Sequence, residues 1–453
     1  MKLKSLLFGS AAILAAGTGA QAADLPTAEP VEYVRICDAF GTGFYYLPGT
    51  DTCLRVGGRV RVDATYVDDF DEGDDDDDDD DDGGGLDDFG DDFFGIDQFT
   101  NNYATRARGN IRLDARTQTD LGLIRAFIDF EMQVGHAGID SEATNYPDQF
   151  ALSAAFIQIS NDMGTFTAGH SGSFFDFFGS YGFGSRIDVD DPTTESTLFA
   201  YTFGGGNGFS ATLSLEDPAS AGRRRNGSDF FIGQEEDYEG QEWPDLVGNI
   251  RVDQGWGSAF LAGVLHHIHD KEGHPEDGEG PDDDDELGWG ITAGAEIKAG
   301  MFSFATQASY ADGATGYITN DPGGVGDISA DEGDDDDDDD GSVTNNGWSI
   351  RASAKAAFTP TVSWVVDGSY TDMNDESEDD DASDDSYRFW VAKTALIWEP
   401  VPGLVMGPEV AYANIDFDGG DENNGDDDDD DDDDDEFGDD DIWGVMWRIQ
   451  RSF

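Results

Sequence analysis

The chain has 453 residues, with 100 acidic residues against 24 basic ones and a formal net charge of −76. That charge disfavours nucleic acid as a partner, and acidity of this degree is typical of disordered chains. Aromatic residues nevertheless make up 12% of the chain, which is high for a disordered protein. We therefore expect the acidic residues and the aromatic residues to occupy different parts of the sequence.

Residues 1–22 have the pattern of a secretory signal peptide. A short basic start precedes an apolar stretch over 6–16, and Ala20-Gln21-Ala22 supplies the small residues that signal peptidase recognises. This stretch is too short to cross a bilayer as a helix, and no later stretch is long enough either. We expect a mature chain that begins near Ala23 and is periplasmic, secreted or an outer-membrane barrel.

Cys37 and Cys53 are the two cysteines of the chain. In an oxidising periplasm, a pair that encloses a short segment predicts a disulfide. Both cysteines precede or open the first expected strand, which places the bond at the periplasmic end. Two free thiols are the alternative.

Many segments then alternate between apolar and polar side chains, which is the repeated signature of transmembrane strands. Successive side chains of a strand point to opposite faces, so each segment has an apolar face and a charged face. A soluble sandwich would explain any one segment, but a membrane barrel explains the set better. The sixteen expected strands are 53–66, 104–118, 121–134, 150–161, 164–171, 196–203, 207–215, 246–254, 257–268, 288–298, 301–311, 346–358, 361–371, 386–398, 403–414 and 442–453.

The connections between these strands alternate between short turns and long segments, as periplasmic turns and extracellular loops do in such barrels. The long ones contain 84 of the 100 acidic residues, so the acidity belongs to one face of the protein. They are expected at 67–103, 135–149, 172–195, 216–245, 269–287, 312–345, 372–385 and 415–441. The sequence therefore predicts an all-β, sixteen-stranded antiparallel transmembrane barrel with long acidic extracellular loops.

The first three strands carry eight arginines on the face opposite their apolar side chains. We expect them to form a basic wall along a water-filled lumen, and arginines that merely solvate a polar face are the alternative. They are Arg55, Arg59, Arg61, Arg106, Arg108, Arg112, Arg116 and Arg125.

The third long connection, 172–195, has too many aromatic residues for a freely solvated loop. Packed inside the barrel, its carboxylates would oppose the arginine wall, and the transverse field would orient dipolar solutes. An exposed loop or a trimer contact is the alternative. The aromatic residues are Phe174, Phe175, Phe177, Phe178, Tyr181 and Phe183, and the acidic ones are Asp176, Asp188, Asp190, Asp191 and Glu195.

Three aspartate runs, at 74–82, 334–340 and 426–435, cannot bury apolar area. Diffuse binding of divalent cations and adaptation of the surface to brine both explain them, and we favour the second. Four histidines, His266, His267, His269 and His274, have no nearby cysteine and are expected to face solvent rather than to bind zinc. We expect no metal site, no cofactor and no catalytic constellation.

The last strand alternates aromatic and apolar residues from Trp443 and ends at Phe453. Such an end resembles the signal that the outer-membrane assembly machinery recognises. The whole strand framework resembles the alphaproteobacterial porin family. The resemblance is closest near the N-terminus, at Ala20–Pro26 and Glu32–Gly41, continues at Pro48–Arg61 and reappears from Gly169-His170 to Phe178. This resemblance implies a trimeric sixteen-stranded channel for small hydrophilic solutes, with the connection 172–195 folded inward. The aspartate runs do not belong to that family pattern.

Together these features predict an outer-membrane porin without catalytic activity, in contact with outer-membrane lipids. The acidic mouth concentrates cations and the arginine wall favours anions, so we expect a weak preference for cations at low salt. A substrate-specific outer-membrane channel and an acidic cation-binding surface protein are the alternatives.

Overall fold

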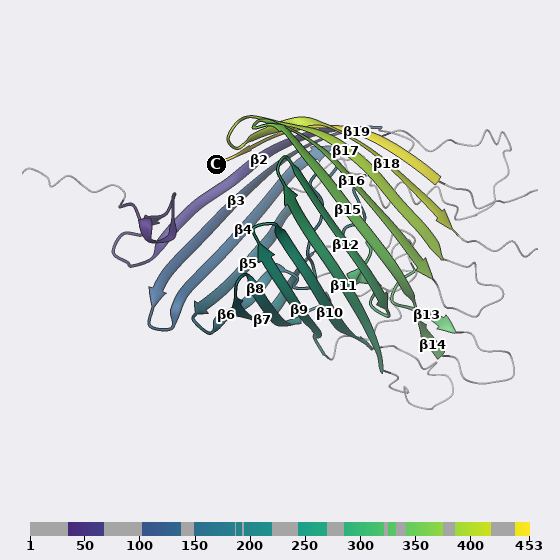
Figure 1. The fold of residues 1–453 in the computed structure, drawn as a ribbon, viewed down its shortest axis with the longest axis horizontal. Coiled ribbons are helices and arrows are strands. Elements are labelled where there is room, and N and C mark those ends of the chain that lie inside the picture. The colour runs from purple at the N-terminus through teal and green to yellow at the C-terminus, as the bar shows by residue number, and fades with distance from the viewer. Residues whose placement is uncertain are drawn as a thin grey trace, which may run out of the picture.

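The computed structural model describes residues 35–67, 102–136, 149–185, 187–192, 194–219, 243–269, 285–320, 325–331, 341–374, 386–417 and 440–453. The expected signal peptide and the three aspartate runs lie outside these residues. Sixteen of the described strands form one antiparallel barrel, in which each strand pairs with its neighbours along the chain (Figure 1). Among the described residues, no helix is long and apolar enough to cross a membrane.

Every expected strand is present, with boundaries shifted by a few residues at most. The barrel strands are β2 (Cys53–Val67), β3 (Tyr103–Thr119), β4 (Gly122–His136), β5 (Gln149–Asn161), β6 (Gly164–Gly172), β7 (Glu195–Gly206), β8 (Phe209–Glu216), β9 (Asp245–Gln254), β10 (Gly257–His269), β11 (Asp285–Ala299), β12 (Phe302–Asp312), β15 (Asn346–Thr359), β16 (Val362–Asn374), β17 (Tyr387–Val401), β18 (Leu404–Phe417) and β19 (Asp440–Ser452). The prediction of a sixteen-stranded barrel is confirmed.

The smaller elements were not expected from the alternating pattern. A 3-10 turn, η1 (Asp38–Phe40), and a two-residue strand, β1 (Tyr45–Tyr46), precede the barrel, and β1 pairs with the start of β2. The connection after β12 contains another 3-10 turn, η3 (Thr315–Tyr317), and the hairpin of β13 (Ile328–Asp331) and β14 (Gly341–Thr344). These elements are too short to show a periodic pattern in the sequence.

The barrel is apolar outside and polar inside, the reverse of a soluble protein. On β2, Val60 and Val62 are 54% and 47% exposed, whereas Arg61 and Asp63 between and beside them are 8% and 2% exposed. Exposed valines on a strand with buried charges are stable only where hydrocarbon surrounds the barrel. The alternation over the other strands repeats this arrangement.

Aromatic pairs mark the outer face at the end where the long connections begin. Tryptophan and tyrosine rings on adjacent strands lie 5.1–6.1 Å apart, between β11 and β12, β15 and β16, β17 and β18, and β19 and β2. Such rings, apolar at one side and polar at the other, are enriched where lipid meets water. The pairs are Trp289–Tyr310, Trp348–Tyr370, Trp390–Tyr412 and Tyr66–Trp443.

The two ends of the described chain both lie at the short-turn end of the barrel. The Cys37–Cys53 disulfide is present, as predicted, and fixes the segment before β2. Phe453 exchanges two backbone hydrogen bonds with Gly58 on β2, at 3.1 and 3.0 Å. A Cβ atom at position 58 would lie 2.9 Å from the Phe453 ring, so the glycine makes room for the last side chain.

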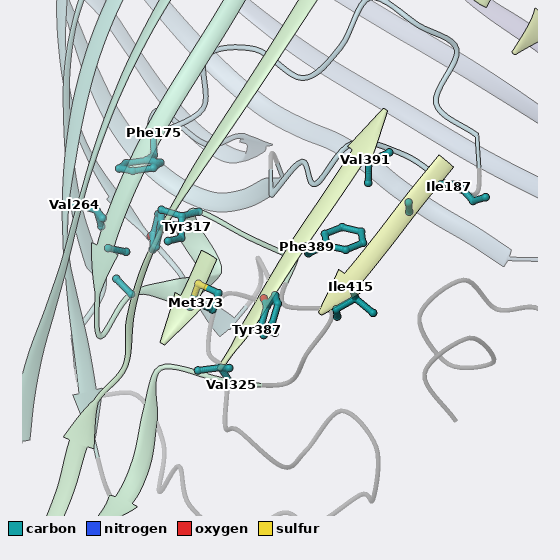
Figure 2. Close-up of a cluster of buried hydrophobic side chains, with 14 of the residues drawn as sticks. Phe175, Ile187, Val264, Tyr317, Val325, Met373, Tyr387, Phe389, Val391 and Ile415 are labelled. Carbon is teal, nitrogen blue, oxygen red and sulfur yellow. The ribbon is translucent and has the colours of Figure 1, made fainter. Parts of the chain in front are cut away.

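An apolar cluster fills part of the barrel interior (Figure 2). Phe175 and Ile187 of the third long connection and Tyr317 of η3 pack there against inward-facing residues such as Phe389 and Ile415. This cluster is a core in an otherwise polar lumen, and it exists because two connections fold into the barrel.

Candidate functional site

The third long connection lies inside the barrel, where its backbone is held by side chains of the wall. The N–H groups of Tyr181 and Phe183 donate to Asp367 on β16 and Glu409 on β18, at 3.1 and 2.7 Å. The N–H of Phe178 donates to Gln307 on β12 at 3.1 Å. Backbone groups inside a barrel need such partners because an unpaired one costs free energy. The prediction that this connection folds inward agrees with this geometry.

The wall approaches the loop so closely at Gly182 that no side chain would fit there. A Cβ atom at this position would lie 2.4 Å from a carboxylate oxygen of Asp367 and 2.7 Å from one of Glu409. Gly294 on β11 allows an equally close approach from the side of the wall, since a Cβ there would lie 2.3 Å from the Phe177 ring.

The aromatic residues of the loop pack against the wall and against each other. Phe175 packs on Tyr317 with ring centroids 5.1 Å apart, and Phe177 stacks on Phe260 of β10 at 5.2 Å. Phe178 packs on Tyr181 at 5.0 Å. The Phe174 carbonyl accepts a hydrogen bond from Asn249 on β9, and the Phe183 ring lies under the Arg448 guanidinium of β19.

Three of the five loop carboxylates are bonded to β15–β17 or to the segment after η3. Asp188 is paired with Lys393 of β17, and Asp191 is paired with Arg351 of β15 at 2.6 Å. Asp190 accepts hydrogen bonds from the hydroxyls of Thr319 and Thr371 and from the backbone N–H of Asn320. The expectation that these three oppose the arginine wall is therefore wrong, because they are used to fix the loop to β15–β17.

The other two predicted carboxylates lie where the loop joins its strands. Asp176 accepts a hydrogen bond from the backbone N–H of Thr194 at 3.0 Å and so closes the base of the loop. Glu195 is the first residue of β7, and its side chain is exposed.

Burial raises the pKa values of two side chains of this loop. Asp190 is 2% exposed, and its desolvation raises the pKa of the carboxyl although three hydrogen bonds favour the charged form. Desolvation also raises the pKa of the Tyr181 hydroxyl, which donates to Glu296 on β11 at 2.8 Å. Tyr181 is therefore a neutral hydrogen-bond donor at any ordinary pH.

All eight predicted arginines lie on the inner face of β2–β4, and each is paired with a carboxylate of the same wall. Arg55, Arg116 and Arg125 share Asp114, at 3.7, 2.8 and 3.1 Å. The other pairs are Arg59–Glu131 at 3.2 Å, Arg108–Glu131 at 2.8 Å, Arg112–Asp129 at 2.6 Å, Arg106–Asp63 at 2.9 Å and Arg61–Asp63 at 3.6 Å. Since four carboxylates serve eight arginines, the wall keeps a positive charge.

Arg448 joins the tip of the loop to this wall. Its guanidinium donates to both oxygens of Asp63 on β2, at 2.6 and 3.1 Å, and to the carbonyls of Phe183 and Gly184. Arg448 therefore bridges the loop tip and the arginine wall across the seam of the barrel.

Several of these partners escaped the sequence analysis. Asp367, Glu409, Lys393 and Arg351 all have inward parity, but parity does not say whether an inward charge faces water or a loop. Arg448 has the inward parity of β19, a strand whose strongest sequence signal is its outward aromatic residues.

One prediction about the histidines is wrong. His266 is not solvent-facing: it is fully buried, and its Nδ1 lies 2.8 Å from Asp245 on β9. Its Nε2 lies 3.7 Å from Asp327 in the connection after β12, and Tyr317 donates to Asp245. Within the described part of the chain, no group of three or more histidine, cysteine or acidic residues has the arrangement of a metal site.

Comparisons with known proteins agree with this geometry. A family model described as "Porin subfamily" matches residues 24–446. The chain is 30% identical over 463 residues to porin Omp2b of Brucella abortus (strain 2308) and 29% identical over 464 residues to porin Omp2b of Brucella neotomae, with 100% of each chain covered. Among solved structures it is similar to the outer membrane channel DcaP of Acinetobacter baumannii, with a TM-score of 0.63 and 16% identity over 90% of this chain and 99% of that one. The charged inner face of β2–β4, the apolar outer face and these matches lead to one conclusion: the chain belongs to the porin family of outer-membrane β-barrel channels.

Proposed function

We propose that the protein is a passive, water-filled diffusion channel for small hydrophilic solutes and ions, that it acts as a homotrimer and that it is not an enzyme. The observation that carries this proposal is the division of the interior. The apolar cluster formed by the third connection and the segment around η3 lies mostly on β9–β19, whereas the inner face of β2–β4 carries the eight arginines and the four carboxylates paired with them. The passage that we propose runs along this arginine wall.

The partners follow from the same surfaces. Outer-membrane lipids would cover the apolar outer face, which the aromatic pairs border at the end of the long connections. The assembly machinery would recognise the end of β19, where the Phe453 side chain is 69% exposed.

Conductance of the refolded protein in a planar bilayer tests the channel. A trimer of open channels inserts in steps that contain three equal conductance levels, with little dependence on the solute. A protein that migrates as a folded barrel without heating but never conducts would contradict the proposal, because its lumen would be closed.

We further propose a weak preference for cations at low salt. The connections carry 84 of the 100 acidic residues of the sequence, against a wall with a surplus of arginine. Fields from the mouth are screened within about 8 Å at physiological ionic strength, and those inside the lumen are screened less. The cation preference should therefore fade as the salt concentration rises. Reversal potentials under a KCl gradient measure it, and anion selectivity at low salt would refute it.

A further inference from the structure

We propose that five arginines near the loop tip form a binding subsite for small oxyanions with two negative charges, such as phosphate or a short dicarboxylate. This inference rests on the proposed channel, because the ligand reaches the site through the lumen. The five residues, called the arginine cluster below, are Arg59, Arg61, Arg106, Arg108 and Arg448.

The register of the barrel brings these arginines together. Arg61 on β2 is the direct cross-strand partner of Arg108 on β3, and Asp63 is the partner of Arg106. Arg448 on β19 is the partner of Asp63 on the other side. Like charges placed directly opposite each other destabilise a sheet, so the Arg61–Arg108 pair is a cost that the fold alone does not explain.

The carboxylates of the cluster are too few for its guanidinium groups. Asp63 is shared by Arg448 at 2.6 Å, Arg106 at 2.9 Å and Arg61 at 3.6 Å. Glu131 is shared by Arg59 and Arg108. Five positive charges therefore face two negative ones, and a ligand with two negative charges would nearly balance them.

Arg61 supplies the observation that points to a ligand. Its side chain is only 9% exposed, and its single ion pair within the described residues is the long one to Asp63. Its Nε is buried and donates to no described acceptor, and the same holds for the Nε of Arg59. A buried charged donor without an acceptor is costly, and the planar fork of a guanidinium matches two oxygens of one oxyanion.

Other arginines of the same wall do not show this arrangement. Arg116 and Arg125 are also direct cross-strand partners. Each of them, however, uses Nε and a terminal nitrogen to bind both oxygens of Asp114, over 2.8–3.3 Å. That pair is closed by a carboxylate of the protein, whereas the arginine cluster is left with unpaired donors.

The cluster also lies where a solute in the lumen would pass. Arg448 joins it to the carbonyls of Phe183 and Gly184 at the loop tip. The side chains of Arg106 and Arg108 are 32% and 20% exposed, so they remain accessible from the lumen.

Ion current through single channels tests the subsite. In NaCl at constant pH and ionic strength, added inorganic phosphate should reduce the current along a saturating curve, and succinate should act in the same way, whereas acetate should not. In Arg61→Gln and Arg106→Gln channels, the half-saturating phosphate concentration should rise about tenfold or more, as the loss of a charge-assisted hydrogen bond implies.

Arg251→Gln is the matched control, since Arg251 is an inward arginine of β9 that is paired with Asp253 at 2.9 Å and lies outside the cluster. Its channels should retain the wild-type phosphate curve. Arg61→Lys keeps the charge but loses the fork, and should weaken phosphate binding while the barrel stays folded on a heat-modifiability gel.

The outcomes separate the two proposals. No conductance in NaCl alone would contradict the diffusion channel. Normal conductance in NaCl with a linear response to phosphate, or a curve that Arg61→Gln leaves unchanged, would overturn the subsite and leave the channel intact.

Discussion

Asp190 is 2% exposed and accepts three hydrogen bonds, from Thr319 at 2.7 Å, from Asn320 at 2.7 Å and from Thr371 at 2.5 Å. Its own backbone N–H donates to Ser369 at 2.8 Å. A single side chain thus ties the third connection both to β16 and to the segment after η3. Burial nevertheless raises the pKa of this carboxyl, so the folded protein holds the Asp190 proton more tightly than the unfolded chain does.

The pH dependence of the stability of the Asp190→Asn variant tests whether burial raises the pKa of Asp190. Because the folded pKa lies above the unfolded value, Asp190 contributes most to stability at low pH, and its contribution falls as the pH rises from about 3.9 through the folded pKa. The stability difference between Asp190→Asn and wild type should therefore shift in favour of the variant over that range and then become constant. Thermal unfolding of both proteins at a series of pH values measures this, and a difference independent of pH would contradict it.

The third connection is the element on which the proposed channel depends. Its tip approaches Asp367 and Glu409 without room for a methyl group at Gly182. Gly182→Ala should push the tip away from the wall, and we expect an altered single-channel conductance with little change in the barrel itself. Gly204→Ala at the end of β7 is the control, because no atom lies within 4 Å of a Cβ placed there. Equal conductance in both variants would show that the tip does not limit the current.

The imidazole of His266 lies between Asp245 and Asp327 and so connects the segment around η3 to β9 and β10. His266→Leu removes the imidazole from two buried carboxylates that keep their hydrogen bonds from Tyr317 and Thr315, and the loss of a hydrogen bond to a buried charged group costs about 1.5–3 kcal/mol. We expect a lower unfolding temperature for His266→Leu and a smaller loss when Asp327→Asn is added. The outward-facing His170 provides the control His170→Leu, whose unfolding temperature should match the wild type; an equal loss in both variants would contradict the role of His266.

At the scale of the whole molecule, the barrel was predictable because its signal is local and repeated. Apolar and charged residues alternate along the strands, as Val60 and Arg61 do on β2. This alternation distinguishes the outward face of a strand from its inward face. The partners of the charged residues inside the barrel were not predictable in the same way. Asp188 and Arg61 are both charged and both directed into the barrel, yet one binds Lys393 and the other lies in the arginine cluster. Such partners depend on how a connection folds in three dimensions, and no period in the sequence records that.

The seam of the barrel has a consequence for how the protein is made. Arg448 and Asp63 are 385 residues apart in the chain and yet share the contact that joins β19 to β2. Contacts between such distant residues form slowly, because a very long loop of chain must first be brought together. The sheet cannot close until the last strand has been synthesised and delivered, and until then the edges of β2 and β19 are open to pairing with other chains. We therefore infer that a newly made chain has to be kept apart from its copies until its final residue has arrived.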